Sequence, residues 1–189
     1  MGDSPVWQLD VDGLEGWTPV RTDLPDEALR IDLGQRIPDQ DESAIPLLAT
    51  LASRARQSSD DSAPLVAMWV RYDDPSEIVP AAVASLRVAG VARDTTPDSF
   101  ARGLAENWPV RSSIELGRLE TASGPAHHLW AIVDVTAGAA FQVQRHDVVF
   151  WLRPEKQECL LLSTSTVDLA RGADLGHELA QLSVGVRGY

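Results

Sequence analysis

Three histidines are the first residues of this chain whose types could support chemistry. His127 and His128 are adjacent, and His146 follows in a later strand candidate. Clustered histidines can bind zinc and related metals. However, neighbouring residues of a strand point to opposite faces of a sheet, so His127 and His128 cannot share one ion. His146 could pair with one of them across a hairpin, with Asp147 or Asp134 nearby. We nevertheless predict packed or solvated histidines and no metal site.

A run of hydroxyl side chains, residues 163–166 (Ser-Thr-Ser-Thr), could supply a nucleophile. Nucleophilic serine needs a base within hydrogen-bond reach. The sequence contains no G-x-S-x-G elbow and no base close to this run. A triad assembled in space stays open, because triads are defined by geometry. Since alternating Ser and Thr are also typical of an ordinary strand, we name no catalytic residue and favour a protein that is not an enzyme.

Acidic pairs and glycines offer little support for a cofactor. Paired carboxylates of the kind used by glycosidases must face each other across a cleft, and each acidic pair here lies beside a predicted turn or helix start. Gly13 and Gly16 lack both the lysine of a P-loop and the third glycine of a dinucleotide-binding loop. We therefore predict no cofactor. The acidic pairs are Asp26-Glu27, Asp41-Glu42, Asp60-Asp61 and Asp73-Asp74.

Composition narrows the class of partner and the compartment. The 189 residues carry a formal net charge of -12, which disfavours nucleic acids and anionic membranes because phosphate contacts need clustered basic residues. The single cysteine, Cys159, allows no internal disulfide and is expected to be a buried, inert thiol. Residues 1–5 lack the features of a signal peptide, and no apolar run approaches the roughly 18 residues of a membrane helix. Lys156 is the one lysine in the sequence and the other basic residues are arginine, a bias typical of high-GC bacterial genomes. We expect a cytoplasmic protein from a high-GC bacterium.

The first part of the chain is acidic and rich in proline. We expect residues 1–42 to form an N-terminal segment that packs on the same domain. Alternation of apolar and polar residues predicts two short strands there, over residues 6–11 and 28–33. In the second, Leu29, Ile31 and Leu33 alternate with polar residues.

Residues 43–189 are predicted to form the core of the domain. Apolar periodicity and capping residues predict helices over 43–56, 96–108 and 174–184. Strands are predicted over residues 65–72, 84–91, 114–121, 127–135, 141–152 and 158–165. Closely spaced strands are typical of a meander, and the apolar run at 65–70 favours cover on both faces. The predicted class is α+β, with an antiparallel β-sheet meander flanked by helices on both faces (an α/β/α sandwich).

The six tryptophans are predicted to have two kinds of role. Trp7 and Trp17 lie in the N-terminal segment, where they would either staple it to the domain or present a docking surface. The other four are expected in the core, and they are Trp69, Trp108, Trp130 and Trp151.

Residues 44–186 resemble a known family. The features that carry the resemblance are the Gly-Pro-Ala turn at 124–126, the strand end Val-Phe-Trp-Leu at 149–152, the strand at 160–165 and the closing helix at 179–184. Together they resemble the PsbP-like fold superfamily, especially its actinobacterial LpqN-type members. The resemblance implies a central antiparallel sheet between helices, and protein partners, since members include photosystem accessory subunits and a Ran-binding nuclear import factor. It carries over no catalytic residue, and the chain lacks the lipoprotein signal and lipidation cysteine of the LpqN type.

These observations favour a non-enzymatic protein-binding or accessory domain. Its partner is expected to be basic or to carry an apolar anchor, with binding that weakens in salt. One alternative is a small-ligand binder or hydrolase-like enzyme with a pocket at the sheet end. Another is an immunity-type or chaperone protein for a basic partner. A free sheet edge could also pair two copies into a homodimer.

Overall fold

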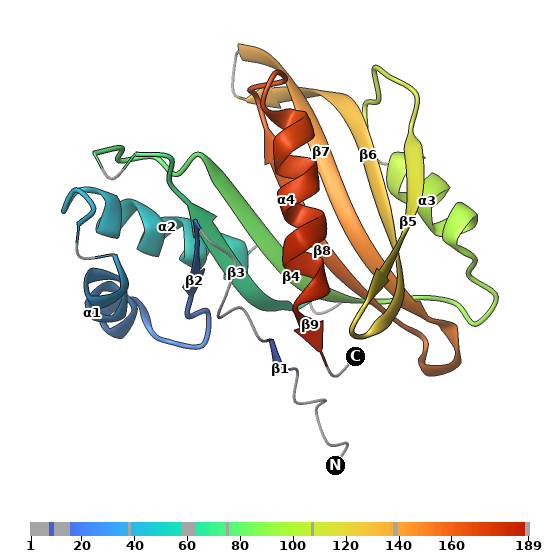
Figure 1. Ribbon diagram of the computed structural model, residues 1–189, viewed down its shortest axis with the longest axis horizontal. Helices are drawn as coiled ribbons and strands as arrows, with labels where there is room; N and C mark the ends of the chain where they lie inside the picture. The colour runs from blue at the N-terminus through green and yellow to red at the C-terminus, as the bar shows by residue number, and fades with distance from the viewer. Residues whose placement is uncertain are drawn as a thin grey trace.

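A seven-stranded antiparallel sheet forms the centre of the computed structural model, which describes residues 8–9, 16–37, 39–57, 63–74, 76–106, 108–137 and 140–187 (Figure 1). The strand order is β2-β3-β4-β8-β7-β6-β5. Its strands are β2 (Trp17–Val20), β3 (Leu65–Arg71), β4 (Ala82–Gly90), β5 (Glu115–Thr121), β6 (Gly124–Ala137), β7 (Ala140–Arg153) and β8 (Glu158–Thr166). A second small sheet pairs β1 (Gln8–Leu9) with β9 (Val186–Arg187).

Four α-helices accompany the sheet in the described part of the chain: α1 (Asp26–Arg36), α2 (Ala44–Gln57), α3 (Pro97–Glu106) and α4 (Gly172–Val184). A short 3-10 turn, η1 (Pro154–Lys156), joins β7 to β8. The predicted α+β class is confirmed: β5 to β8 form an antiparallel meander, and helices flank both faces of the sheet. No helix within the described residues is long and apolar enough to span a membrane.

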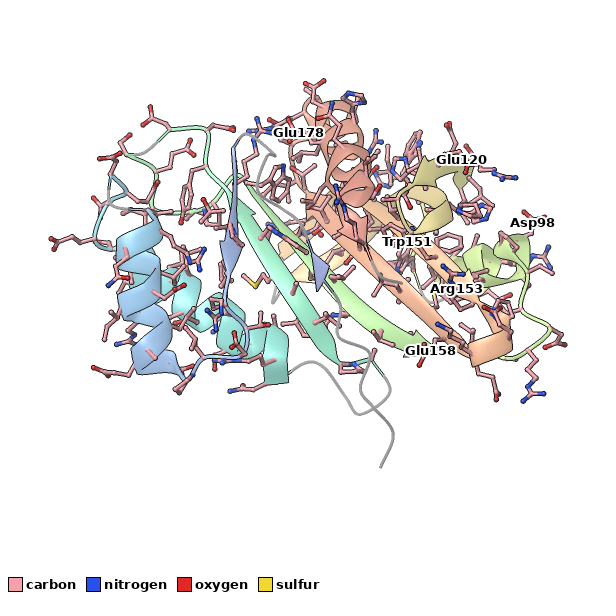
Figure 2. All side chains as sticks on the ribbon, turned by 60° about the horizontal axis from the view of Figure 1, so that its bottom comes forward. Asp98, Glu120, Trp151, Arg153, Glu158 and Glu178 are labelled. Carbon is pink, nitrogen blue, oxygen red and sulfur yellow. The ribbon has the colours of Figure 1, made fainter. Side chains whose placement is uncertain are left out.

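One face of the sheet is covered by α4, which crosses it in front in Figure 1. Leu175, Leu179 and Leu182 recur at the spacing of one helix face and are buried against the strands. Beneath them lie Trp151 and Leu162, among other buried side chains. Figure 2 shows Glu178 on the flank of α4 nearest β2, where it forms an ion pair with Arg71 of β3.

The opposite face carries two separate apolar clusters. Leu29, Leu33 and Leu48 of α1 and α2 pack on Met68 and Val70 of β3, at one end of the sheet. At the other end α3 packs on β6, β7 and β8, through Phe100, Leu104, Leu129 and Phe150 among others. The middle of this face lies between the two clusters, and a hollow lined in part by residues of β4, β7 and β8 opens there.

The strand predicted over residues 28–33 is wrong, because this segment belongs to α1. Pro25 and the acidic pair that follows it begin the helix, with the acids in its first turn, where the helix dipole favours them. Leu29 and Leu33 lie one turn apart and are fully buried, whereas Ile31 is 60% exposed. The apolar residues at every second position fit a strand, but only those four apart face the core.

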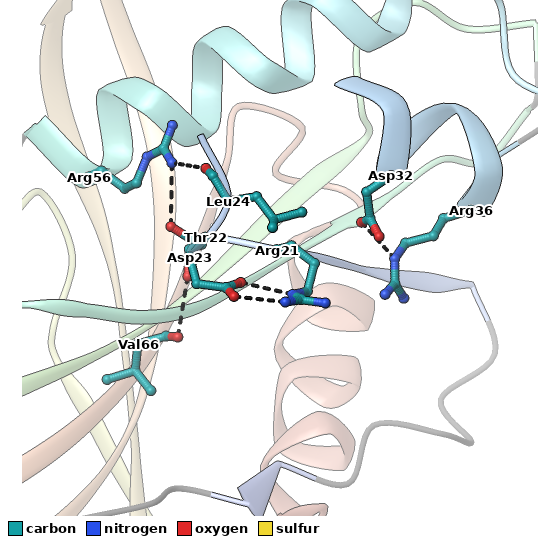
Figure 3. Close-up of polar contacts among 8 residues, drawn as sticks. All are labelled: Arg21, Thr22, Asp23, Leu24, Asp32, Arg36, Arg56 and Val66. Atoms are coloured by element: carbon teal, nitrogen blue, oxygen red, sulfur yellow. Dashed lines mark hydrogen bonds and ion pairs between the residues drawn. The ribbon is translucent and has the colours of Figure 1, made fainter. Parts of the chain in front are cut away.

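The connection between β2 and α1 is held by α2. Arg56 donates hydrogen bonds from Nη1 to the carbonyl oxygens of Thr22 (3.4 Å) and Leu24 (2.5 Å), as Figure 3 shows. Thr22 Oγ1 in turn donates to the carbonyl of Val66 in β3 (3.4 Å). In β2 itself, Trp17 is buried in the core beneath α4. Trp7 and most of the strand predicted over residues 6–11 lie outside the described residues.

Helix α3 begins where predicted but ends earlier. Thr96 Oγ1 accepts the backbone N–H of Ser99 (3.2 Å), which caps the first turn. The helix ends at Glu106, so Trp108 lies beyond it and is only partly buried. Trp130 is also half-buried rather than part of the core. The other predicted helices and strands of the core are present, with ends shifted by up to three residues.

Candidate functional site

The three histidines do not assemble into one site. His128 Nε2 lies 2.9 Å from Asp147 Oδ1 on the α4 face, whereas His127 stacks on Phe150 on the α3 face, with ring centroids 5.4 Å apart. Their predicted separation onto opposite faces is therefore confirmed. His146 is paired in register with Ala131, so the suggested pairing with another histidine is wrong. Within the described residues no group of three metal-ligating side chains could hold an ion.

Asp147 is the centre of a buried charged cluster. The residue is 1% exposed, and Arg145 donates to both of its carboxylate oxygens, from Nε to Oδ2 (2.8 Å) and from Nη2 to Oδ1 (3.0 Å). The guanidinium of Arg145 also lies over the ring of Trp130, 4.2 Å from its centroid. Burial raises the pKa of Asp147, but the bonds from His128 and Arg145 outweigh it and leave that pKa below its usual value. The carboxylate is therefore ionised and bonded on both oxygens.

Two glycines of α4 bring the helix against this cluster. A Cβ at Gly176 would lie 2.6 Å from Asp147 Oδ1, and one at Gly172 would lie 2.5 Å from Arg145 Cδ. Such distances are shorter than atoms tolerate, so a side chain at either position would displace Arg145, Asp147 or the helix itself. The cluster is sealed by the helix, and we assign it a structural role.

The opposite face holds a hollow that we call the sheet pocket, with a volume of about 370 Å³. Val83 on one side packs against the α1–α2 cluster, and Trp108 on the other packs against the α3 cluster. The pocket thus opens where neither group of helices covers the strands. Its lining residues are Val83, Ser85, Trp108, His146, Val148, Ser163, Thr164 and Ser165.

Strand register brings the polar residues of the sheet pocket together. Ser163 of β8 lies opposite both Ser85 of β4 and Val148 of β7, and Ser165 lies opposite His146. The hydroxyl oxygens of Ser85 and Ser163 are 3.1 Å apart, so one donates to the other. Because side chains alternate along a strand, β8 directs both of its serines to the face opposite α4.

His146 and Trp108 form one wall of the sheet pocket. Burial lowers the pKa of His146, so its ring is neutral at pH 7. The ring Nε2 lies 3.2 Å from Gln144 Oε1, and donation from Nε2 leaves Nδ1 as an acceptor. Trp108 meets the imidazole edge-on, with centroids 5.3 Å apart. Backbone hydrogen bonds next to Trp108 fix the position of this residue; for example, Asp134 N–H donates to the carbonyl oxygen of Pro109 (2.9 Å).

A second hollow, which we call the loop hollow, lies between the β3–β4 and β8–α4 connections and has a volume of about 610 Å³. Both connections lie toward the upper side of Figure 1. Arg171 links them through an ion pair with Asp73. The lining residues are Asp73, Ser76, Glu77, Ile78, Val79, Ala81, Thr166, Val167, Asp168 and Arg171.

The loop hollow is apolar in part and acidic at its rim. Ile78, Val79 and Val167 are 45%, 66% and 59% exposed. Beside them, the backbone N–H and hydroxyl of Ser76 bond to Asp74 and lower the pKa of that carboxyl. Asp74 therefore keeps its negative charge across the physiological range of pH.

Sequence reasoning named some of these residues but not their grouping. Of the residues with predicted chemistry, His146, Ser163, Thr164 and Ser165 lie together in the sheet pocket, whereas Thr166 lines the loop hollow. The sequence analysis did not identify Ser85, whose one signal is that it and Arg87 are the two polar side chains of an otherwise apolar strand. Cys159 is buried, as predicted, and burial raises the pKa of its thiol.

No protein-family model matches this chain, and no curated protein is significantly similar to it.

Proposed function

We propose that this chain is a non-enzymatic protein-binding domain, and that the loop hollow receives a segment of its partner. The observation that carries the proposal is the gathering of apolar side chains on the two loops. Of the eight exposed large hydrophobic residues in the described part of the chain, four lie there: Ile78, Val79, Val167 and Leu169. Apolar patches with a polar rim are typical of interaction surfaces.

The charge of the rim supports a basic partner. Asp73, Glu77 and Asp168 line the hollow beside the apolar residues, and Asp74 follows Asp73 in the chain. Arg171, the cation among the described lining residues, is already paired with Asp73. The whole chain adds to this field with a net charge of -12. Complementary charge steers association and selects against acidic partners. The segment that fits has an apolar anchor flanked by Lys or Arg.

Two sequence-based inferences agree with this proposal. A PsbP-like relationship would place the chain among proteins that mostly bind other proteins, although a shared fold by itself says little about function. The acidic composition supports a location in a bacterial cytoplasm, where excess charge keeps proteins dispersed.

Selection of displayed random peptides tests the proposal. We expect the wild-type protein to enrich peptides with Leu, Ile or Phe flanked by Lys or Arg. The double variant Val79→Asp with Val167→Asp should bind the enriched peptides at least about tenfold more weakly, because it removes the apolar centre of the hollow. Raising salt from about 0.05 M to about 0.5 M should weaken wild-type binding, because charges at the rim are screened.

Ile31→Asp is the matched control. Ile31 is 60% exposed and lies on α1, outside the loop hollow. This variant should bind the enriched peptides as the wild type does, and all variants should keep the wild-type melting temperature to within a few degrees. A selection without binders, enrichment of acidic peptides, or equal binding by the double variant would contradict the proposal.

A further inference from the structure

We propose a second site on this protein: the sheet pocket binds a small neutral molecule with several hydroxyl groups, about the size of one sugar ring. This inference is independent of the loop hollow, because the described lining residues of the two hollows are all different. The sheet pocket has a volume of about 370 Å³, which lies within the range of ligand sites, roughly 300–1,000 Å³.

Charge in the pocket argues for a neutral ligand. Although the chain has 44 charged side chains of Asp, Glu, Lys and Arg, none of these types is found among the described residues that line this pocket. His146 is uncharged at pH 7, because burial disfavours its protonated form. An ionic ligand would lose hydration without gaining a counter-charge, and burying an unpaired charge is costly. A neutral ligand avoids this cost.

Hydrogen-bonding capacity in the pocket argues for hydroxyl groups on the ligand. Ser85 and Ser163 bond to each other, and because a hydroxyl has one donor and two acceptor positions, the pair keeps a donor and several acceptors for a ligand. The hydroxyl of Ser165 and Nδ1 of His146 add further positions. A ligand group that both donates and accepts hydrogen bonds can pair with these donors and acceptors, and a hydroxyl group does both.

The walls argue for a ligand that also has an apolar side. Val83 and Val148 supply aliphatic surface, and Trp108 supplies an aromatic ring. Trp108 is partly exposed, and its ring meets that of His146 at an interplanar angle of 77°. Pockets that combine apolar walls with a few placed polar groups are typical of small-molecule sites. A sugar ring, with C–H groups on its faces and hydroxyls around its edge, matches this arrangement.

Titration followed by NMR tests this inference with defined probes. Methyl α-glucoside and myo-inositol serve as neutral probes, glucuronate as an anionic one and glucosamine as a cationic one. We expect a neutral probe to shift the indole N–H signal of Trp108 and the ring signals of His146, with saturation in the millimolar range. The charged probes should bind at least about tenfold more weakly.

Variants separate the pocket from the rest of the surface. Ser163→Val removes a hydroxyl that lines the sheet pocket, and the larger side chain fills part of the pocket. The variant should therefore bind the neutral probe at least about tenfold more weakly. Ser85→Ala provides a second test should the valine variant melt at a lower temperature. Ser53→Ala on α2, outside the pocket, is the matched control and should bind normally. The inference is overturned when no neutral probe shifts the NMR signals of Trp108 and His146, or when charged probes bind as tightly as neutral ones. Equal binding of the neutral probe by Ser163→Val and Ser53→Ala would also overturn it.

Discussion

Strand β7 presents polar side chains to both faces of the sheet, and the two faces differ in how they accommodate them. On the α4 face Arg145 and Asp147 are bonded to each other and sealed beneath a helix. On the other face His146 lies in the wall of a hollow beside a pair of serines. The same strand therefore contributes to a packed interior on one side and to an accessible pocket on the other.

Helix coverage explains the difference. A charge can be buried where partners satisfy it and packing excludes water, and Gly172 and Gly176 let α4 approach closely enough to do this. On the other face the helices form two groups with the pocket between them. Polar groups there keep unused hydrogen-bonding positions, which is the condition for binding a ligand. Changes on the α4 face should therefore alter stability, and changes in the pocket should alter binding.

The largest effect is expected from Asp147→Asn. The substitution removes the negative charge to which Arg145 and His128 are bonded. Removing one partner of a buried ion pair lowers the free energy of unfolding by about 3 kcal/mol or more. Urea unfolding at pH 7 measures the loss. Glu120→Gln breaks the exposed pair with Arg118 and should change stability little, because solvent screens such pairs. Equal effects of the two variants would show that the α4 face is not sealed.

A smaller loss is expected from Gly176→Ala. The added Cβ would meet Asp147 Oδ1 at 2.6 Å, and overpacking of this kind costs about 2 kcal/mol. Gly103→Ala in α3 is the matched control, because a Cβ there would meet nothing within 4 Å. The control should gain up to about 1 kcal/mol, since alanine favours helix. Thermal melting of both variants checks the prediction, and a gain at both positions would contradict close packing of α4.

The smallest change in stability is expected from replacing His127 and His146, which lie on the face of the sheet opposite α4. Burial lowers the pKa of both His127 and His146, so the unfolded chain binds protons more readily than the folded one as pH falls below about 6.5. The contribution of the neutral histidines to stability should therefore be present above about pH 6.5 and decrease as the pH falls from there toward about pH 5. The pKa of Asp147 is below its usual value, so its contribution is lost only at lower pH. The double variant His127→Gln with His146→Gln should show a smaller decrease in unfolding free energy over this window, and an unchanged decrease would contradict the assignment.

Much of the fold could be predicted because it depends on local patterns. The helix beginning at Pro97 follows a capping threonine and a proline, and α4 repeats leucine at helical spacing. The placement of His127 and His128 on opposite faces follows from strand geometry alone. Where local patterns were ambiguous the prediction failed, as for Leu29, Ile31 and Leu33, whose spacing fits a strand and whose burial pattern is that of a helix.

The sequence by itself determined the antiparallel meander and the helix near the C-terminal end of the described chain, because both follow from patterns among residues that are close in sequence. It also determined the acidic net charge, which depends on composition alone. Tertiary structure alone decided which residues form the sites. Ser85 and Ser163 meet because β8 pairs with β4 across 78 residues, and Trp108 reaches the pocket because the chain after α3 pairs with β6. Long-range strand pairing depends on the packing of the whole sheet, and spacing along the sequence carries no record of it.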